Sequence, residues 1–329
     1  MLKYILKRIG ISILLLLGVS FILYALLRCM PVDFVETKIN NLAASGNSVS
    51  DEFKEQLYAT YGLNGNIVEG YFSWLGNLCR LDFGNSFKSQ RPVIKEIFAA
   101  DRMGTSFVVA AIATIFEFLI AIPLGITAAT HQYSFRDYLV TVLVLIGISL
   151  PSFFFGQILK GIFADKLGWF PSEGMLTAGV TYANLFEKLG DYIAHMFLPV
   201  LTVVILSIGG RMRMTRTNML EVLNSDYIRT ARAKGLSERK VIYKHAFRNT
   251  LIPLVTGLAG LIPSLFSGAM ITESVFQLSG LGKYALEAMQ MGDIPVIMTY
   301  NMFLAVLSVT GVLLSDLMYA VVDPRVKLA

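Results

Sequence analysis

The chain has 329 residues, of which 55% are hydrophobic and only 16% are charged. Soluble globular domains carry charge on about a quarter of their residues, so this composition excludes an ordinary soluble domain. Lys and Arg number 28 against 23 Asp and Glu, which gives a net charge of +5. We therefore expect an integral membrane protein with an excess of basic residues.

Six apolar runs with few charged residues account for this composition. Each reaches the roughly 20 residues that a helix needs to cross the hydrocarbon core of a bilayer. The runs are residues 9–27, 104–130, 138–159, 192–210, 249–272 and 294–315. The sequence thus predicts an all-α integral membrane protein with six transmembrane helices. No A-x-A site follows the first run, which is longer than the apolar part of a signal peptide, so we interpret it as an uncleaved anchor.

The placement of Lys and Arg predicts the orientation of these helices. With the N-terminus inside, residues 1–8, 131–137, 211–248 and 323–329 together hold 16 Lys and Arg, and the short outer loops 161–191 and 273–293 hold three. The long outer segment holds seven, but long segments cross the membrane largely regardless of charge. Both termini are therefore expected on the cytoplasmic side.

Residues 29–103 are too polar for the bilayer and are expected to form a lobe on the outer face. Residues 48–51 (SVSD) have the pattern of a capping box, which predicts a helix over 51–61 that Gly62 ends. A second helix is expected near residues 70–78, where three aromatic residues suit the membrane interface. Cys29 and Cys79 both fall in this lobe, and the sequence leaves open whether they pair or remain free thiols.

Three parts of the chain follow from this organisation. Residues 1–28 form the N-terminal tail and first helix, residues 29–103 the outer lobe, and residues 104–329 the membrane core with a polar loop at 211–250. Glu117 interrupts the second run near its centre. An ionisable group at that depth either faces a cavity or partner helix, or is protonated and hydrogen-bonded, and the sequence leaves both open.

The basic excess is concentrated in residues 211–248. This segment has ten Lys and Arg and three acidic residues, so its charge of +7 exceeds that of the whole chain. Within it, Asn224, Ser225 and Asp226 offer N-cap oxygens, and Gly235 stands where a helix would end in the left-handed conformation. The pattern predicts a helix of about two turns, roughly 12 Å long, and Ser237 is expected to cap a second helix.

The side chains of this short helix are expected to fall on different faces. Tyr227, Ile228 and Ala231 share one face and the arginines another, while small residues would let the helix sink into a groove of a partner. The candidate docking residues are Asp226, Tyr227, Ile228, Arg229, Thr230, Ala231, Arg232, Ala233, Lys234 and Gly235.

Several kinds of chemistry are not encoded. The three histidines lie in separate segments with no metal-binding spacing. Residues 277–284 (QLSGLGKY) lack the first Gly and the final Ser or Thr of a phosphate loop. No set of nucleophile, base and acid is visible, so we expect a protein that is not an enzyme. The basic segment lacks interleaved aromatic residues, which argues against nucleic acid as a partner.

The basic segment resembles a known family element. Residues 226–235 (DYIRTARAKG) and 248–253 (RNTLIP) are similar to the EAA loop of ABC importer permeases, in the form of the first permease subunit of the peptide and nickel subfamily. Further matches lie at residues 71–76 (YFSWLG), 82–87 (DFGNSF), 90–93 (QRPV), 122–125 (IPLG), 149–153 (SLPSF), 167–172 (LGWFPS), 219–223 (MLEVL) and 316–325 (DLMYAVVDPR). The chain departs from the family pattern at residues 31–34 (PVDF) and 63–66 (LNGN).

The resemblance implies a type I ABC importer permease fold in a bacterial cytoplasmic membrane. It implies an extracytoplasmic lobe between helices 1 and 2, and a cytoplasmic coupling helix between helices 4 and 5. The implied partners are a homologous second permease subunit, two ABC ATPase subunits that bind ATP and Mg, and an extracytoplasmic substrate-binding protein. This chain would hold no cofactor. The implied substrate is a di- or oligopeptide, and Glu117 and Glu273 are candidate residues of the translocation path.

Two alternatives remain at this stage. The same machinery could import nickel chelates or another small ligand, because selectivity in this class can reside in the binding protein. Alternatively, the chain could be a membrane-anchored structural or signalling subunit whose outer lobe is the working part. That second alternative leaves the ordered helix of the basic loop without a role.

Overall fold

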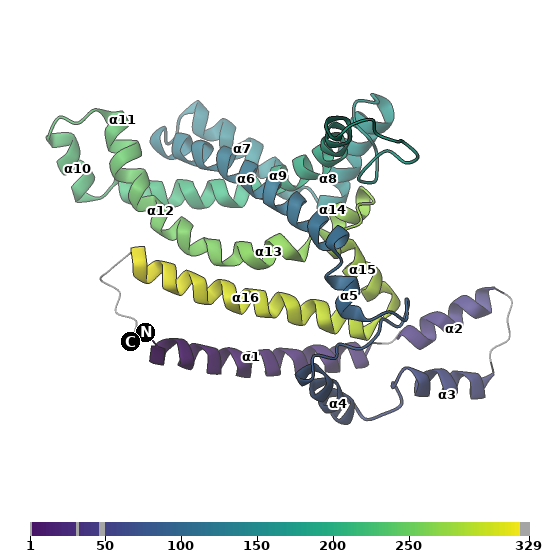
Figure 1. The fold of residues 1–329 in the computed structure, drawn as a ribbon. Helices are drawn as coiled ribbons and strands as arrows, with labels where there is room; N and C mark the ends of the chain where they lie inside the picture. The colour runs from purple at the N-terminus through teal and green to yellow at the C-terminus, as the bar shows by residue number, and fades with distance from the viewer. Residues whose placement is uncertain (1, 31–32, 46–49, 323–329) are drawn as a thin grey trace.

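The computed structural model describes residues 2–30, 33–45 and 50–322, and in these ranges it is built of helices and their connections. Four helices are long: α1 (Leu2–Arg28), α6 (Ala100–Thr130), α9 (Leu185–Leu223) and α16 (Ile294–Val322). Each of them contains a stretch long and apolar enough to cross a membrane. Figure 1 shows α1 and α16 side by side, with the other long helices above them.

The third predicted span is not one straight helix. It is divided between α7 (Phe135–Ser149) and a second part made of α8 (Ser152–Leu159) and η1 (Lys160–Lys166), and the two parts are bent by 102°. Leu150 is extended (ψ 131°) before Pro151, as expected because proline disfavours the helical conformation of the residue before it. If the bent pair counts as one span, the described part of the chain has five candidate spans.

The fifth predicted span is also broken. Residues 249–272 are divided among α12 (Phe247–Thr256), η3 (Gly257–Gly260), α13 (Leu261–Ser267) and α14 (Met270–Val275). The last break lies at Gly268, whose φ of +70° requires glycine, and a Cβ there would come within 2.7 Å of the Gly282 nitrogen. Six apolar runs therefore correspond to four long helices, one bent pair and one broken run.

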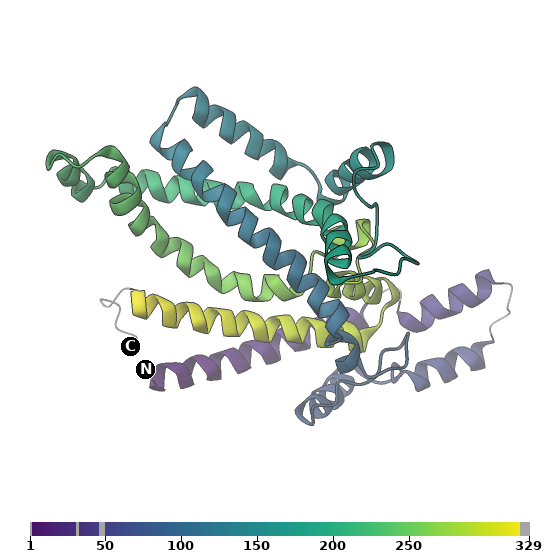
Figure 2. The same cartoon turned by 45° about the horizontal axis from the view of Figure 1, so that its top comes forward.

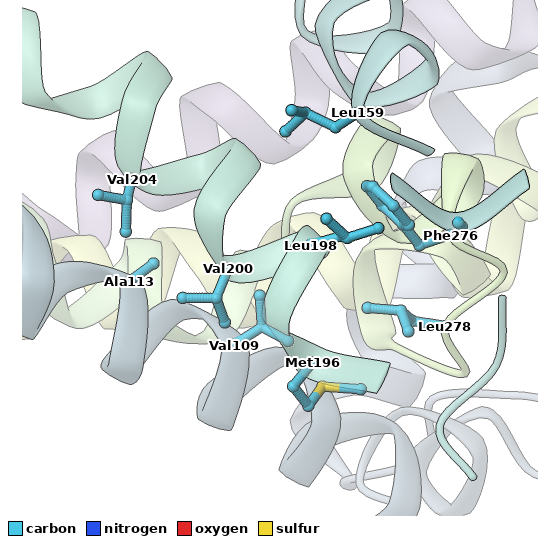
Figure 3. Packing of buried hydrophobic residues seen from close by; sticks show 10 residues of the cluster. Val109, Ala113, Leu159, Met196, Leu198, Val200, Val204, Phe276 and Leu278 are labelled. Carbon is cyan, nitrogen blue, oxygen red and sulfur yellow. The ribbon is translucent and has the colours of Figure 1, made fainter. Parts of the chain in front are cut away.

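The fourth predicted span is longer than expected. The apolar run ends at residue 210, but α9 continues to Leu223, so Arg211, Arg213 and Arg216 lie on a helix instead of in a loop. Figure 3 shows how α9 packs along α6, with Val109 and Ala113 facing Val200 and Val204. At Gly125 the two helices approach so closely that a Cβ would lie 2.9 Å from the Met212 carbonyl oxygen.

The outer lobe contains the two helices expected from the sequence and two others. The expected helices are α3 (Asp51–Thr60) and α4 (Ile67–Cys79), and the additional ones are α2 (Phe34–Ala44) before them and α5 (Val93–Ile97) after them. Ser50 caps α3 by accepting a hydrogen bond from the Phe53 amide, and Gly62 follows with a φ of +65°. Residue 48 of the expected capping box lies outside the described residues. Cys29 and Cys79 are free and exposed.

The elements separate toward two ends of the molecule. Figures 1 and 2 both place α10 (Asp226–Ala233) and α11 (Glu238–Lys240) at one end, with the beginning of α1 and the end of α16. The lobe helices α2–α4 lie at the opposite end, as does α15 (Leu281–Met291). The basic segment and the outer lobe are therefore on opposite sides of the bundle. The expected basic residues of 323–329 lie outside the described ranges.

Candidate functional site

The short helix predicted between the N-cap candidates and Gly235 forms. α10 begins one residue before Tyr227 and ends at Ala233. Ser225 is its N-cap residue by backbone conformation, but its side chain makes no cap hydrogen bond. Instead, the Ser225 hydroxyl donates to the Val222 carbonyl at 2.6 Å, and this bond ties the start of α10 to the end of α9. Ser237 likewise precedes α11 without a side-chain cap.

One face of α10 packs against its own chain. Ile228 has no exposed surface and Ala231 is buried. They belong to a cluster that includes Met219 on α9, Ala129 at the end of α6, and Val241. Tyr227, which was expected on the same face by helical spacing, is 46% exposed. Ala231, which was expected to face a partner, is buried against its own chain.

The C-terminal end of α10 depends on Gly235. Its φ is +76°, and its amide donates to the Arg232 carbonyl at 2.9 Å. A Cβ at Gly235 would meet no atom within 4 Å. Glycine is therefore required by the left-handed backbone and not by lack of space, as the sequence predicted.

The remaining residues of α10 and the residues next to it form an exposed face, which we call the coupling surface. The coupling surface consists of Asp226, Tyr227, Arg229, Thr230, Arg232, Ala233, Lys234 and Gly235. Arg229 is more open than Arg232, since its side chain is 73% exposed against 43% and only a 3.5 Å contact links it to Asp226.

Arg232 is engaged within the chain. Its Nη2 donates to Glu238 Oε1 at 2.7 Å and its Nε to Oε2 at 3.3 Å. These hydrogen bonds from Arg232 lower the pKa of the Glu238 carboxyl, and the carboxylate in turn raises the pKa of Arg232. The pair joins α10 to α11, so Arg232 shapes the coupling surface as well as contributing charge.

A second ion pair braces the base of this surface, and sequence reasoning missed it. Arg216 on α9 binds Asp137 at the start of α7 with two hydrogen bonds, Nε to Oδ1 at 3.0 Å and Nη2 to Oδ2 at 2.9 Å. Asp137 is only 4% exposed and also accepts from the Tyr133 amide. Nothing in the sequence connects two residues 79 positions apart, so only the fold reveals this pair.

Glu117 faces a cavity and also contacts a neighbouring helix. Its Oε1 accepts a hydrogen bond from Arg211 Nε at 3.0 Å, and the two side chains are 12% and 15% exposed. Both residues line a cavity of about 510 Å³ between α6, α9 and the α12–α13 segment. The sequence left the surroundings of Glu117 open. It did not suggest Arg211 as the partner, because Arg211 was assigned to the loop.

Glu273 has different surroundings. It has no exposed surface and does not line that cavity, although Gly268 and Ala269 beside it do. Its carboxylate accepts from the Ser106 hydroxyl at 2.7 Å and from the Lys283 amide at 2.8 Å. Glu273 therefore joins α6, α14 and the start of α15. Across the ranges that the structure describes, no group of three or more potential metal ligands is found.

Residues 121–328 match the model of the family described as the binding-protein-dependent transport system inner membrane component. The match covers more than half of the chain. The chain belongs to this family. It is therefore a multi-pass membrane component of a transport system that uses a separate binding protein and separate ATPase subunits, and it is not itself an enzyme. This confirms the family that the basic segment and the dispersed motifs resembled.

Relatives match along nearly the whole chain. The oligopeptide transport system permease protein AppB of Bacillus subtilis is 37% identical over 327 residues, covering 99% of this chain and 100% of AppB. The dipeptide transport system permease protein DppB of Alkalihalophilus pseudofirmus is 33% identical over 340 residues, covering 99% and 100%.

A solved structure supports the fold independently. The structure reported for inward-facing conformations of the MetNI methionine ABC transporter has a TM-score of 0.54, with 16% sequence identity. The similarity covers 70% of this chain and 98% of the other. At this identity the likeness concerns the fold alone, and it agrees with the ABC importer permease fold expected from the sequence.

Proposed function

We propose that this chain is the permease subunit through which an ATP-binding-cassette importer moves di- or oligopeptides across the cytoplasmic membrane. The relatives that match its full length carry names of oligopeptide and dipeptide permeases, which favours peptides over nickel chelates. Family membership excludes the alternative of a purely structural or signalling subunit.

We infer that α10 is the coupling helix, held in a groove of an ATPase subunit. The observation that carries this proposal is the two-sided character of α10. Its buried face is fixed to α6 and α9 through Ile228 and Ala231, while its coupling surface is exposed and basic at one end of the molecule. A cationic surface of this kind suits a separate protein partner. ATP and Mg would bind to that partner and not to this chain.

The packing of α10 suggests how movement reaches the transport path. When the ATPase dimer closes on ATP, it displaces α10, and the cluster around Met219 makes α9 and the end of α6 follow. These two helices also line the 510 Å³ cavity. Displacement of α10 therefore changes the walls of the cavity, which we propose as the translocation path with Glu117 on its lining.

The two ends of the molecule would then face opposite compartments. We place the end with α10, the start of α1 and the end of α16 in the cytoplasm, in keeping with the charge of the basic segment, and the lobe helices α2–α4 outside. A binding protein would deliver its load at the outer end. A homologous second permease subunit and a second ATPase would complete the assembly.

Charge reversal at Arg229 tests the docking proposal. Arg229→Glu should weaken binding of the ATPase subunit about fivefold at low salt, because an exposed ion pair contributes up to about 1 kcal/mol. The difference should shrink at high salt, where exposed charges are screened over distances well below 10 Å. Pull-down of the ATPase by the purified permease across salt concentrations measures both effects.

Arg80→Glu is the matched control for this experiment. Arg80 follows α4 in the outer lobe and is exposed, so the same charge change is made at the opposite end of the molecule. Arg80→Glu should bind the ATPase like the unaltered protein. Equal binding by the Arg229→Glu and unaltered proteins at every salt concentration would contradict the assignment of the coupling surface.

A further inference from the structure

The cavity between α6 and α9 contains one ion pair in mostly uncharged surroundings. Its volume of about 510 Å³ is in the range of pockets that hold small molecules. Besides Glu117 and Arg211, the lining consists of apolar residues, glycines and four hydroxyl-bearing residues, Thr114, Ser207, Ser264 and Ser267. A charged side chain inside a membrane span is costly and usually marks a substrate or ion path.

The Arg211 guanidinium is held in a particular way. Only its Nε donates to Glu117, at 3.0 Å. The centre of the Phe118 ring lies 4.4 Å from its central carbon, so the group rests on an aromatic face. Within the described ranges, Nη1 and Nη2 have no hydrogen-bond partner, yet neither is shut away from solvent. The edge formed by Nη1 and Nη2 is thus open to a ligand.

That edge has a defined chemical preference. Two parallel N–H groups of a guanidinium bind the two oxygens of a carboxylate in a bidentate arrangement, which is stronger and more directional than a single hydrogen bond. Glu117 uses a different edge of Arg211, so it positions the group without occupying the bidentate edge. We propose that the Nη1–Nη2 edge of Arg211 binds the terminal carboxylate of a peptide in passage.

The proposal rests on the proposed function, since it assigns a step of peptide passage to the cavity. Glu117 has a second effect besides orientation. Its negative charge partly offsets that of Arg211, which limits how tightly a carboxylate is held. A transport path requires binding that is favourable enough for entry and weak enough for release. The Glu117–Arg211 pair therefore suits a site that binds a carboxylate weakly and briefly, and not a high-affinity site.

Binding of tripeptides to the assembled transporter, measured without its binding protein, tests the proposed carboxylate site at Arg211. The probes are trialanine with a free carboxylate, trialanine amide, and a glutamate-containing tripeptide amide, measured by saturation-transfer NMR in detergent. Removal of the binding protein ensures that its own selectivity does not affect the result. The complex should bind the free acid more tightly than the amide. Arg211→Gln should weaken binding of the acid about tenfold, since a charge-assisted bidentate contact is lost, and leave the amide unchanged.

Two further variants make the test specific. Arg213→Gln removes the same charge from an exposed position two residues along α9, and should leave the preference for the free acid intact. Arg211→Lys keeps the positive charge but loses the two parallel N–H groups of the guanidinium. This variant should therefore retain only part of the preference for the free acid over the amide. If Arg211→Gln prevents assembly of the complex, the Arg211→Lys result decides the question by the same comparison of acid with amide.

The outcomes separate cleanly. Equal affinity of the unaltered complex for acid and amide, or no binding of either, overturns the proposal, as does full acid binding by Arg211→Gln. If the glutamate-containing amide binds as tightly as the free acid and loses affinity in Arg211→Gln, the site binds any carboxylate of a peptide through Arg211. That result would support the proposal. Uptake of trialanine by proteoliposomes with all subunits is measured in parallel, and its absence counts against the proposed function alone.

Discussion

At the scale of single residues, Gly235 controls the end of α10 through its backbone. A β-branched residue at a φ of +76° is strained, at a cost of roughly 1–2 kcal/mol. Gly235→Val should therefore reduce peptide uptake and substrate-stimulated ATP hydrolysis by the reconstituted complex. Gly235→Asn is the matched control, because asparagine tolerates the left-handed conformation, and a Cβ meets no neighbour there. Equal loss in both variants would show that the conformation is not the cause.

Glu238 makes the coupling surface sensitive to acid. Arg232 lowers the pKa of the Glu238 carboxyl from its ordinary value of 4.5. A lowered pKa means that the pair contributes its full stability above 4.5 and loses it as the pH falls through the folded-state pKa. Carbon NMR of labelled glutamate carboxyls, with Glu238→Gln to identify the resonance, should show a low pKa that Arg232→Gln returns toward normal. No change in Arg232→Gln would contradict the pairing.

Sequence reasoning at the residue scale was accurate for backbone requirements and weaker for partners. The positive φ of Gly235 follows from local chemistry, so the sequence predicts it. The exposure of Tyr227 depends on where α6 and α9 lie, which helical periodicity alone does not say. Glu117 was identified as important by its depth in an apolar run, but its partner Arg211 was hidden by the assumption that α9 ends where the apolar run ends.

At the scale of elements, the Asp137–Arg216 pair fixes the start of α7 to α9. Asp137 is buried, so removal of either partner leaves an uncompensated group and should cost roughly 3 kcal/mol. Asp137→Asn and Arg216→Gln should each lower the melting temperature of the purified complex, and the double variant should cost less than the two added together. Arg213→Gln on the same helix should leave the melting temperature nearly unchanged. Strict additivity of the two costs would contradict a direct pair.

Apolar runs in the sequence predict that a helix is present better than they predict that the helix is unbroken. Every predicted run is mostly helical, because apolar length is a local property. The bend at Leu150 and Pro151 was open to prediction from the proline, and was missed because the run was treated as one span. The break at Gly268 depends on the buried Glu273 and on Gly282 behind it. Contacts of that kind come from distant segments and are absent from the local pattern.

At the scale of the whole molecule, charge and hydropathy predicted the separation into two ends. The segment of +7 and the polar lobe lie at opposite ends of the bundle, as alternating spans require. What the sequence did not provide is the cavity, because its walls come from α6, α9 and the α12–α13 segment together. At this scale we propose that a separate ATPase subunit binds the coupling surface of α10.

Site-specific photocross-linking tests this claim most directly. A benzophenone side chain would replace Tyr227 on the coupling surface, Tyr133 in the exposed turn between α6 and α7, or Phe72 on the outer lobe, all exposed positions. In the assembled transporter, the probe at Tyr227 should cross-link to the ATPase subunit, and the probe at Phe72 should not. Cross-linking of the ATPase subunit from the probe at Tyr133, with none from the probe at Tyr227, would show that the ATPase subunit binds another part of the chain.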